Sequence, residues 1–215
     1  MNKYTIIVFD FDVIHDVTDS IVSSLQATIN ELGLPHRSDD ECRNMIALKK
    51  RVIDIPAILF PDTIIDQEQF ARNYLRIFDK EVLKEITLYP QVMDTLQELK
   101  RRGIKICMIS DKKIHSTLDD ISKSTGLTSV VNCILGKDDV SESRPSPEAI
   151  NTILKKFNAK AEDIILVGDT VFDVMMAKST GVPLCGITHR SGNRELLADA
   201  NWIIDKFCDL TIITA

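Results

Sequence analysis

The sequence predicts an α/β fold, with an open parallel sheet, helices on both of its faces and a helical subdomain inserted after the first strand. Short apolar runs rich in Ile and Val recur along the chain without polar alternation, which is typical of parallel strands buried on both faces. Amphipathic segments of helical length lie between these runs. The gap between the first two runs is much longer than one crossover helix needs, so it predicts an insertion.

The sheet is predicted from six apolar runs, taken in chain order. They cover residues 6–9, 104–109, 130–135, 164–167, 184–187 and 202–204. The predicted helices of the core cover residues 92–102, 114–125, 147–157 and 171–180. Because the crossover between two parallel strands places its helix on a face of the sheet, this alternation predicts helices on both faces.

The insertion between the first two strands is predicted to be helical. One helical face carries Ile21, Leu25, Ile29 and Leu32, and a second apolar stripe carries Phe70, Tyr74, Ile77 and Phe78. Between them, Ser38 and Glu41 have the spacing of a capping box. We therefore predict a core of residues 1–16 and 85–215 and an α-helical cap of residues 17–84. Ligands of open α/β sheets bind at the carboxyl ends of the strands, so this cap is expected to cover the site.

Length, charge and cysteine content limit the possible functions. The 215 residues allow one core plus a small subdomain. With 26 basic and 32 acidic residues the net charge is −6, which argues against a nucleic-acid partner. No apolar run approaches the roughly 18 residues of a membrane span. The first run is too short for a signal peptide, and the five cysteines form no C-x-x-C pair. These features predict a reduced, cytoplasmic protein without membrane association, either a monomer or a homodimer.

Two pairs of aspartates follow predicted strands. Asp10 and Asp12 end the first strand, and Asp169 and Asp173 follow the run 164–167 with the i to i+4 spacing of a helix. Each pair alone fits a turn or a helix cap. Both pairs, however, belong to the same edge of one sheet, where four carboxylates would repel one another. Oxygen-rich sites of this kind usually hold Mg²⁺, so the sequence predicts a magnesium site at this edge.

Two further segments lead to the same edge. Ser110 follows the second strand and is itself followed by Asp111 and two lysines. Arg144 precedes a Pro-Ser-Pro segment in which Ser146 is predicted to be the N-cap of the next helix. Taken alone, Arg144 could equally be a solvated loop residue. His15, just after the acidic loop, is interpreted as a solvated histidine that could touch a substrate.

These residues, in this order, resemble the haloacid dehalogenase superfamily of phosphohydrolases, in the branch with a helical cap that includes phosphoglycolate phosphatases and β-phosphoglucomutases. The four motifs of the family are matched by Asp10-Phe11-Asp12, by Ser110, by Arg144 before Pro145, and by Gly168-Asp169-Thr170 with Asp173. The likeness covers nearly the whole chain, including the position of the cap, and it implies a Rossmann-like core.

The resemblance implies a Mg²⁺-dependent phosphatase acting on a small phosphorylated metabolite, such as a phosphoglycolate-like compound or a sugar phosphate. Asp10 would attack the phosphorus to form an aspartyl-phosphate, and Asp12 would act as general acid and then base. Mg²⁺ would be bound by Asp10, by the backbone carbonyl of Asp12 and by Asp169, with Asp173 bound directly or through water. Ser110 and Arg144 would bind the phosphate.

Four positions depart from the family pattern. Val13 replaces a usual Gly, Ile14 a Thr or Val, Arg144 a Lys, and Asp111 a frequent amide. A β-branched residue resists positive φ, so Val13 predicts strain in the acidic loop, whereas Arg144 keeps the positive charge. The departures leave open a catalytically impaired phospho-ligand-binding or interaction protein, and a phosphosugar mutase would use the same core. A phosphonatase would need a cap lysine, for which Lys49 and Lys50 are candidates.

Overall fold

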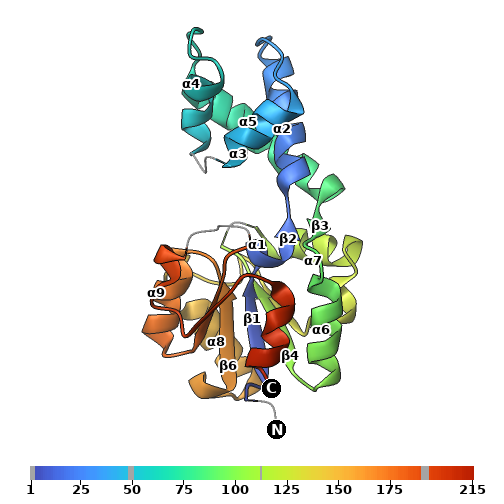
Figure 1. Cartoon of the computed structure of the whole chain (residues 1–215), viewed down its shortest axis with the longest axis vertical. Helices are drawn as coiled ribbons and strands as arrows, with labels where there is room; N and C mark the ends of the chain where they lie inside the picture. The colour runs from blue at the N-terminus through green and yellow to red at the C-terminus, as the bar shows by residue number, and fades with distance from the viewer. Residues whose placement is uncertain (1–2, 48–50, 112, 190–193) are drawn as a thin grey trace. The chain divides into compact units, whose positions relative to one another are not determined.

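The computed structural model describes residues 3–47, 51–111, 113–189 and 194–215, so Lys49, Lys50 and Lys112 lie outside the described residues. The chain divides into two compact units (Figure 1). Met1–His15 and Leu88–Ala215 form the first, which we call the core unit, and Asp16–Thr87 form the second, the helical unit. Where the chain passes from one unit to the other, β2 (His15–Asp16) pairs with β3 (Thr87–Leu88).

A six-stranded parallel sheet forms the centre of the core unit. Its strands are β1 (Ile6–Asp10), β4 (Lys105–Ile109), β5 (Cys133–Leu135), β6 (Ile164–Gly168), β7 (Leu184–Ile187) and β8 (Trp202–Ile204). Their order is β5-β4-β1-β6-β7-β8, which places β1 between β4 and β6. Every residue of β1 is buried, as expected for a central strand without polar alternation. The predicted α/β class with an open parallel sheet is confirmed.

One strand is shorter than its apolar run. The run 130–135 is predicted to be extended throughout, but only Cys133–Leu135 pair with β4. The amides of Val130 and Val131 donate instead to the carbonyl of Leu127, which begins a 3₁₀ turn (Leu127–Ser129). The turn therefore takes the donors that a longer strand would need.

Helices cover both faces of the sheet. α8 (Glu148–Phe157) and α9 (Val171–Thr180) bury side chains such as Ile153 and Met176 in one hydrophobic cluster with Ile6 and Val8 of β1. Phe9 points to the opposite face because side chains alternate along a strand. Its ring stacks on Phe207, just before α10 (Leu210–Ile213), with 5.3 Å between the ring centroids. α6 (Val92–Arg101) packs against α10 and β4, and α7 (His115–Ser124) follows β4.

The helical unit contains α2 (Thr18–Glu31), α3 (Asp39–Ala47), α4 (Ile55–Leu59) and α5 (Gln67–Glu85). Apolar positions on the predicted helical faces, including Leu25 of α2 and Phe70 of α5, are buried in one hydrophobic cluster. The predicted capping box is present: the Glu41 amide donates to Ser38 Oγ at 3.2 Å and the Ser38 amide to Glu41 Oε2 at 2.7 Å. In the described parts of the chain, none of the helices combines the length and the apolar character that crossing a membrane requires.

Candidate active site

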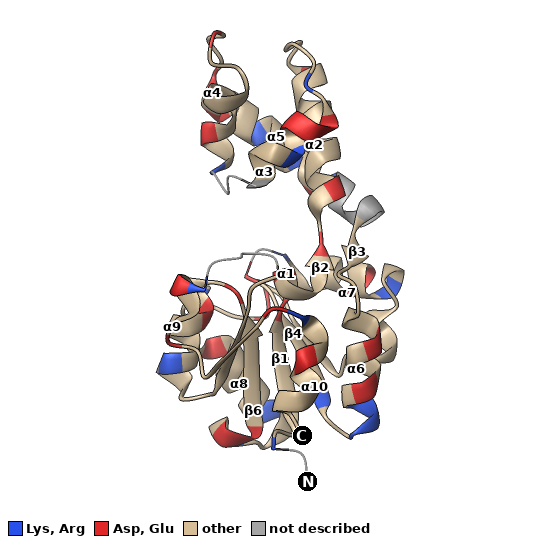
Figure 2. Ribbon diagram, in the orientation of Figure 1, with Lys and Arg blue, Asp and Glu red and all other residues tan. Residues whose placement is uncertain are grey.

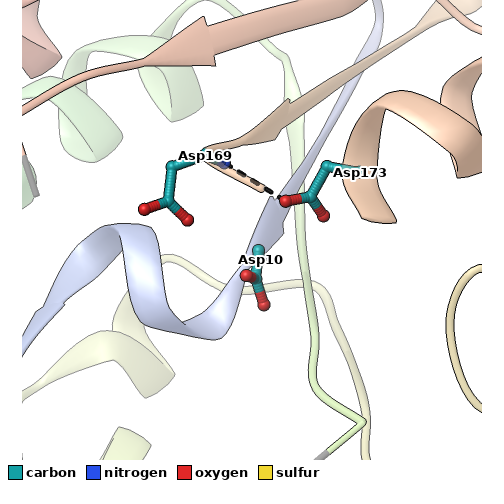
Figure 3. Close-up of side chains that lie close together, drawn as sticks. All are labelled: Asp10, Asp169 and Asp173. Atoms are coloured by element: carbon teal, nitrogen blue, oxygen red, sulfur yellow. Dashed lines mark hydrogen bonds between the residues drawn. The ribbon is translucent and has the colours of Figure 1, made fainter. Parts of the chain in front are cut away.

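Three aspartates converge at the carboxyl end of the core sheet (Figure 3). Asp10 ends β1, Asp169 follows β6, and Asp173 lies in the first turn of α9. Each offers an oxygen atom within 4.8 Å of one from each of the others, and all three residues are at most 2% exposed. β1 and β6 are neighbouring parallel strands, so their ends bring Asp10 and Asp169 side by side. Figure 2 shows further acidic residues on the loops at this edge.

The turn after β6 is built around Asp173. Its Oδ2 accepts hydrogen bonds from the Asp169 amide at 3.2 Å, the Thr170 amide at 3.0 Å and Thr170 Oγ1 at 2.6 Å. Thr170 is the N-cap of α9 and accepts in return from the Asp173 amide. Gly168 has no room for a side chain, because a Cβ there would lie 2.3 Å from Cγ of Asp173. The cap of α9 is thus Thr170 and not Asp169, whose carboxylate lies with those of Asp10 and Asp173.

Asp10 leads into a short helix, α1 (Phe11–Ile14), where the sequence predicts a loop. Asp10 occupies the N-cap position, but its side chain makes no capping hydrogen bond. Val13 lies inside this helical turn and is fully buried. Among the described non-glycine residues, only Gln91 and Asn158 have positive φ, so the strain predicted at Val13 is wrong.

Arg144 lies among the carboxylates. Its Nη1 is 2.9 Å from Oδ2 of Asp10 and 3.0 Å from Oδ1 of Asp173, and its Nη2 is 2.6 Å from Oδ1 of Asp111. The Arg144 side chain is 7% exposed, so the alternative of a solvated loop arginine is wrong. One guanidinium thus joins the ends of β1 and β4 to the start of α9 through three charge-assisted contacts.

The loop that carries Arg144 is anchored by Glu148, in the first turn of α8. The Glu148 carboxylate accepts from the amides of Ser141 and Glu142, both at 2.9 Å, and from Ser141 Oγ at 2.8 Å. Pro147 occupies the N-cap position, one residue later than predicted. Ser146 still contributes, because its Oγ accepts from the Glu148 amide at 3.3 Å.

Ser110 and Asp12 flank the carboxylate group. Ser110 follows β4 and is 7% exposed; its amide donates to the Leu135 carbonyl at 2.9 Å, and its Oγ accepts from the Lys113 amide at 3.3 Å. The next residue, Asp111, pairs with Arg144, which places Ser110 at the same edge. Asp12 is half-buried in the first turn of α1. Among the described residues, the carboxylate group consists of Asp10, Asp169 and Asp173 and does not include Asp12.

Burial disfavours the ionised form of the Asp10 carboxyl. Burial first, and then the charge of Asp173, raise the pKa of Asp10 from 3.8 to about 7, with a smaller contribution from Asp12 and against the opposing effect of Arg144. Asp10 Oδ2 is buried and has no hydrogen-bond partner of good geometry among the described residues, although Arg144 lies beside it. A divalent cation would satisfy this oxygen and favour the ionised carboxyl. The donor set, made of carboxylate oxygens, fits Mg²⁺.

Two features of the site escape the sequence interpretation. The first is that Asp111 pairs with Arg144. Two departures from the family pattern could have indicated this pair, because an acid stands where an amide is frequent and an arginine stands where a lysine is usual. His15 is not solvated but fully buried: its ring stacks on Phe11 at 4.1 Å, and its Nδ1 is 2.9 Å from the Phe11 carbonyl oxygen. The i to i+4 spacing of these two residues was the signal for that contact.

Comparison with known proteins agrees with this geometry. A family model described as haloacid dehalogenase-like hydrolase matches residues 7–187. A phosphoglycolate phosphatase from Vibrio parahaemolyticus is 26% identical, over 98% of this chain and 96% of its own length. A pyrophosphatase, PpaX, from Anoxybacillus flavithermus is 28% identical, over 99% and 97%. Among solved structures, a haloacid dehalogenase-like hydrolase from Bacteroides fragilis is 26% identical with a TM-score of 0.73, over 97% of this chain and 100% of its own. The chain therefore belongs to the haloacid dehalogenase-like hydrolases, in the branch that contains these phosphatases.

Proposed function

We propose that this protein is a Mg²⁺-dependent phosphatase that hydrolyses the phosphate ester of a small metabolite through an aspartyl-phosphate intermediate. The observation that carries the proposal is the buried group of Asp10, Asp169 and Asp173, with Arg144 beside it, at the carboxyl edge of a parallel sheet. The names of its relatives, a phosphoglycolate phosphatase and a pyrophosphatase, support a small phosphorylated substrate. A cytoplasmic location is part of the proposal and is supported by the cysteines, four of which are buried as thiols.

Asp10 is the nucleophile in this proposal. Its carboxylate attacks the phosphorus in line, the bond from phosphorus to the ester oxygen breaks, and the phosphoryl group is left on Asp10. Water then cleaves the aspartyl-phosphate and releases inorganic phosphate. Attack requires the ionised carboxyl, and the guanidinium of Arg144, 2.9 Å away, favours that form against the effect of burial.

Asp12 acts as the general acid and then the general base. It lies two residues after the nucleophile, and its partial exposure gives it the contact with solvent that Asp10 largely lacks. It protonates the leaving oxygen and later takes a proton from the attacking water. Ser110 and Arg144 donate hydrogen bonds to the phosphoryl oxygens, and the guanidinium adds positive charge.

Asp10, Asp169 and the backbone carbonyl of Asp12 would hold Mg²⁺. Asp173 has a different role, because its Oδ2 already accepts from three donors and its Oδ1 from Arg144. We propose that Asp173 stabilises the turn after β6, and that any contact between Asp173 and the cation is made through water. When bound, the cation supplies positive charge that offsets the clustered carboxylates and the phosphoryl oxygens.

The proposal is tested by hydrolysis of p-nitrophenyl phosphate. Turnover is expected with Mg²⁺, none with EDTA, and a loss of at least about 10³-fold in Asp10→Asn, because the nucleophile is removed. Asp199→Asn is the matched control, since Asp199 is an exposed aspartate paired with Lys178 at 2.7 Å, and its turnover should equal that of the wild type. Turnover without metal, or full activity in Asp10→Asn, would overturn the proposal.

A panel of phosphorylated metabolites then separates the remaining candidates. Release of phosphate identifies a phosphatase, whereas conversion of one sugar phosphate into its isomer identifies a mutase. If no compound is turned over while one of them raises the melting temperature, the protein is a phospho-ligand binder.

A further inference from the structure

We propose that Asp111 is a positioning residue that fixes the orientation of the Arg144 guanidinium, so that only one of its terminal nitrogens faces Asp10 and Asp173. This inference rests on the proposed function. It concerns a residue at which this chain departs from the family pattern, and it explains why an arginine can stand where a lysine is usual.

The geometry of the guanidinium shows two separate attachments. Nη2 donates to Asp111 Oδ1 at 2.6 Å, while Nη1 lies 2.9 Å from Asp10 Oδ2 and 3.0 Å from Asp173 Oδ1. Asp111 belongs to the loop after β4, so it holds the guanidinium from a different side than β1 and α9 do. The side chains of Arg144 and Asp111 are 7% and 22% exposed, so solvent weakens this pair much less than a surface pair.

Without Asp111, the same guanidinium would have another stable arrangement. Arginine presents its donors as a planar fork, and two neighbouring carboxylates accept such a fork readily. Both terminal nitrogens would then lie on Asp10 and Asp173. That arrangement would cover the attacking oxygen of Asp10 and neutralise the carboxylates that are proposed to hold the cation. A lysine, with a single ammonium group, has no second nitrogen to restrain.

The backbone of the Arg144 loop has an independent anchor. Glu148 accepts hydrogen bonds from the amides of Ser141 and Glu142, both at 2.9 Å, and neither involves Asp111. Replacing Asp111 should therefore free the guanidinium and leave the loop in place. This separation makes the orientation of one side chain testable.

The test is a double-mutant cycle of Asp111→Asn and Arg144→Lys, measured as kcat and KM for p-nitrophenyl phosphate with Mg²⁺. In the arginine background, Asp111→Asn is expected to lower kcat/KM about 10-fold. In the lysine background, the same change is expected to cost less than about 3-fold, because there is no fork to orient. Equal losses in both backgrounds, or no loss in the arginine background, would overturn the proposal.

A binding measurement gives a second readout that does not depend on turnover. Inorganic phosphate should raise the melting temperature of the wild type in Mg²⁺, and Asp111→Asn should reduce that increase while Asp199→Asn should not. If Asp111→Asn does not fold, Asp111→Glu can take its place, because it keeps the charge but shifts it by one methylene. Asp111→Glu should also lower kcat/KM, and unchanged turnover in this variant contradicts the proposal. A wild type without turnover or phosphate binding would instead reject the proposed function itself.

Discussion

Asp169 and Asp173 belong to one sequence motif, yet their surroundings give them different tasks. Asp173 Oδ2 accepts from three donors of the turn that contains Asp169, and its Oδ1 faces Arg144. Asp169 is buried beside the carboxylates of Asp10 and Asp173, and like charges this close repel one another. One residue therefore holds the local fold, and the other brings its carboxylate to the buried group.

This difference predicts unequal effects of two similar substitutions on stability. Asp173→Asn should lower the free energy of unfolding by about 3 kcal/mol, because an amide group would face the donors that a carboxylate now accepts from. Asp169→Asn should lower it much less, because it removes one of the clustered charges and keeps the three hydrogen bonds that Asp173 Oδ2 accepts. Urea unfolding in EDTA measures both, and equal destabilisation by the two variants would contradict the assignment.

His15 predicts a pH dependence of stability. Burial lowers the pKa of His15 from 6.5 to about 4, so below pH 6.5 the unfolded chain binds a proton that the folded chain does not. The contribution of His15 to the free energy of unfolding therefore falls as the pH drops from 6.5 to about 4, and at higher pH this effect is absent. Between pH 7.5 and pH 5 the wild type should lose about 2 kcal/mol more than His15→Gln.

The exposed His36 provides the control for this measurement. His36→Gln should follow the wild type across the same pH range in urea unfolding. If His15→Gln also follows the wild type, the His15 ring is not held neutral by the folded protein.

At the scale of the element, α1 changes the expected effect of Val13. If the loop were strained at Val13, as the sequence predicts, Val13→Gly would raise turnover. In the structure Val13 is a fully buried residue of a helical turn, so its side chain contributes to the core. Val13→Gly should cost on the order of 3 kcal/mol through lost burial and the low helix propensity of glycine, and turnover should not rise. Thermal unfolding and a p-nitrophenyl phosphate assay measure the two effects.

The turn after β6 depends on Gly168 for a steric reason. A Cβ at this position would lie 2.3 Å from Cγ and 2.5 Å from Cβ of Asp173, and the buried Asp173 cannot move without losing its hydrogen bonds. Gly168→Ala should therefore displace Asp173 and Asp169 and lower turnover by at least about 10²-fold. Gly181→Ala is the control: Gly181 ends α9 with φ of +71° and open space around it, so it should cost stability but little activity.

The elements could be predicted from sequence because their signals are local. The strand at 184–187 and the helix at 171–180 match the structure residue for residue, since apolar runs and helix caps act over a few neighbouring positions. The run 130–135 is apolar throughout, but the amides of Val130 and Val131 donate to the carbonyl of Leu127. The periodicity of apolar residues cannot distinguish such a turn from a longer strand.

The side-chain partners in the site were harder to predict. Asp111 and Arg144 are 33 positions apart, and only the folded sheet shows that they touch. In the sequence, Asp111 is only an acid at a position where an amide is frequent, whereas in the structure its carboxylate pairs with the guanidinium of Arg144. The burial of His15 was also hard to predict, because its packing on Phe11 depends on the surrounding core.

At the scale of the whole molecule, each of the two units has a hydrophobic cluster of its own. The helical unit has its own hydrophobic cluster, which includes Leu25, Ile29 and Phe70, and the core unit is built on the six-stranded sheet. Unfolding need not be one transition, so a probe confined to one unit is required. Trp202, the single tryptophan, lies in β8 and reports on the core unit alone.

Three of the acids that contribute to the net charge of −6 are buried together, and this predicts a linkage between Mg²⁺, protons and stability. Because the pKa of Asp10 is about 7 in the metal-free fold and 3.8 when unperturbed, the folded chain binds the extra proton between these values. The contribution of Asp10 to the metal-free stability should therefore fall as the pH rises from about 4 to 7, and it stays lower above pH 7. Mg²⁺ competes with that proton, so the stabilisation by Mg²⁺ should be larger at pH 8 than at pH 5.

At pH 8, Mg²⁺ at 100 times its dissociation constant should add about 2.7 kcal/mol, which corresponds to a rise in melting temperature of roughly 5–10 °C for a protein of this size. Trp202 fluorescence follows the transition, with NaCl at equal ionic strength as the control for screening. At pH 5 the rise should be much smaller, because Mg²⁺ must first displace the proton on Asp10. Asp10→Asn should lose most of the rise at pH 8. An equal rise at both pH values, or an undiminished rise in Asp10→Asn, would show that Mg²⁺ binds somewhere other than the three buried aspartates.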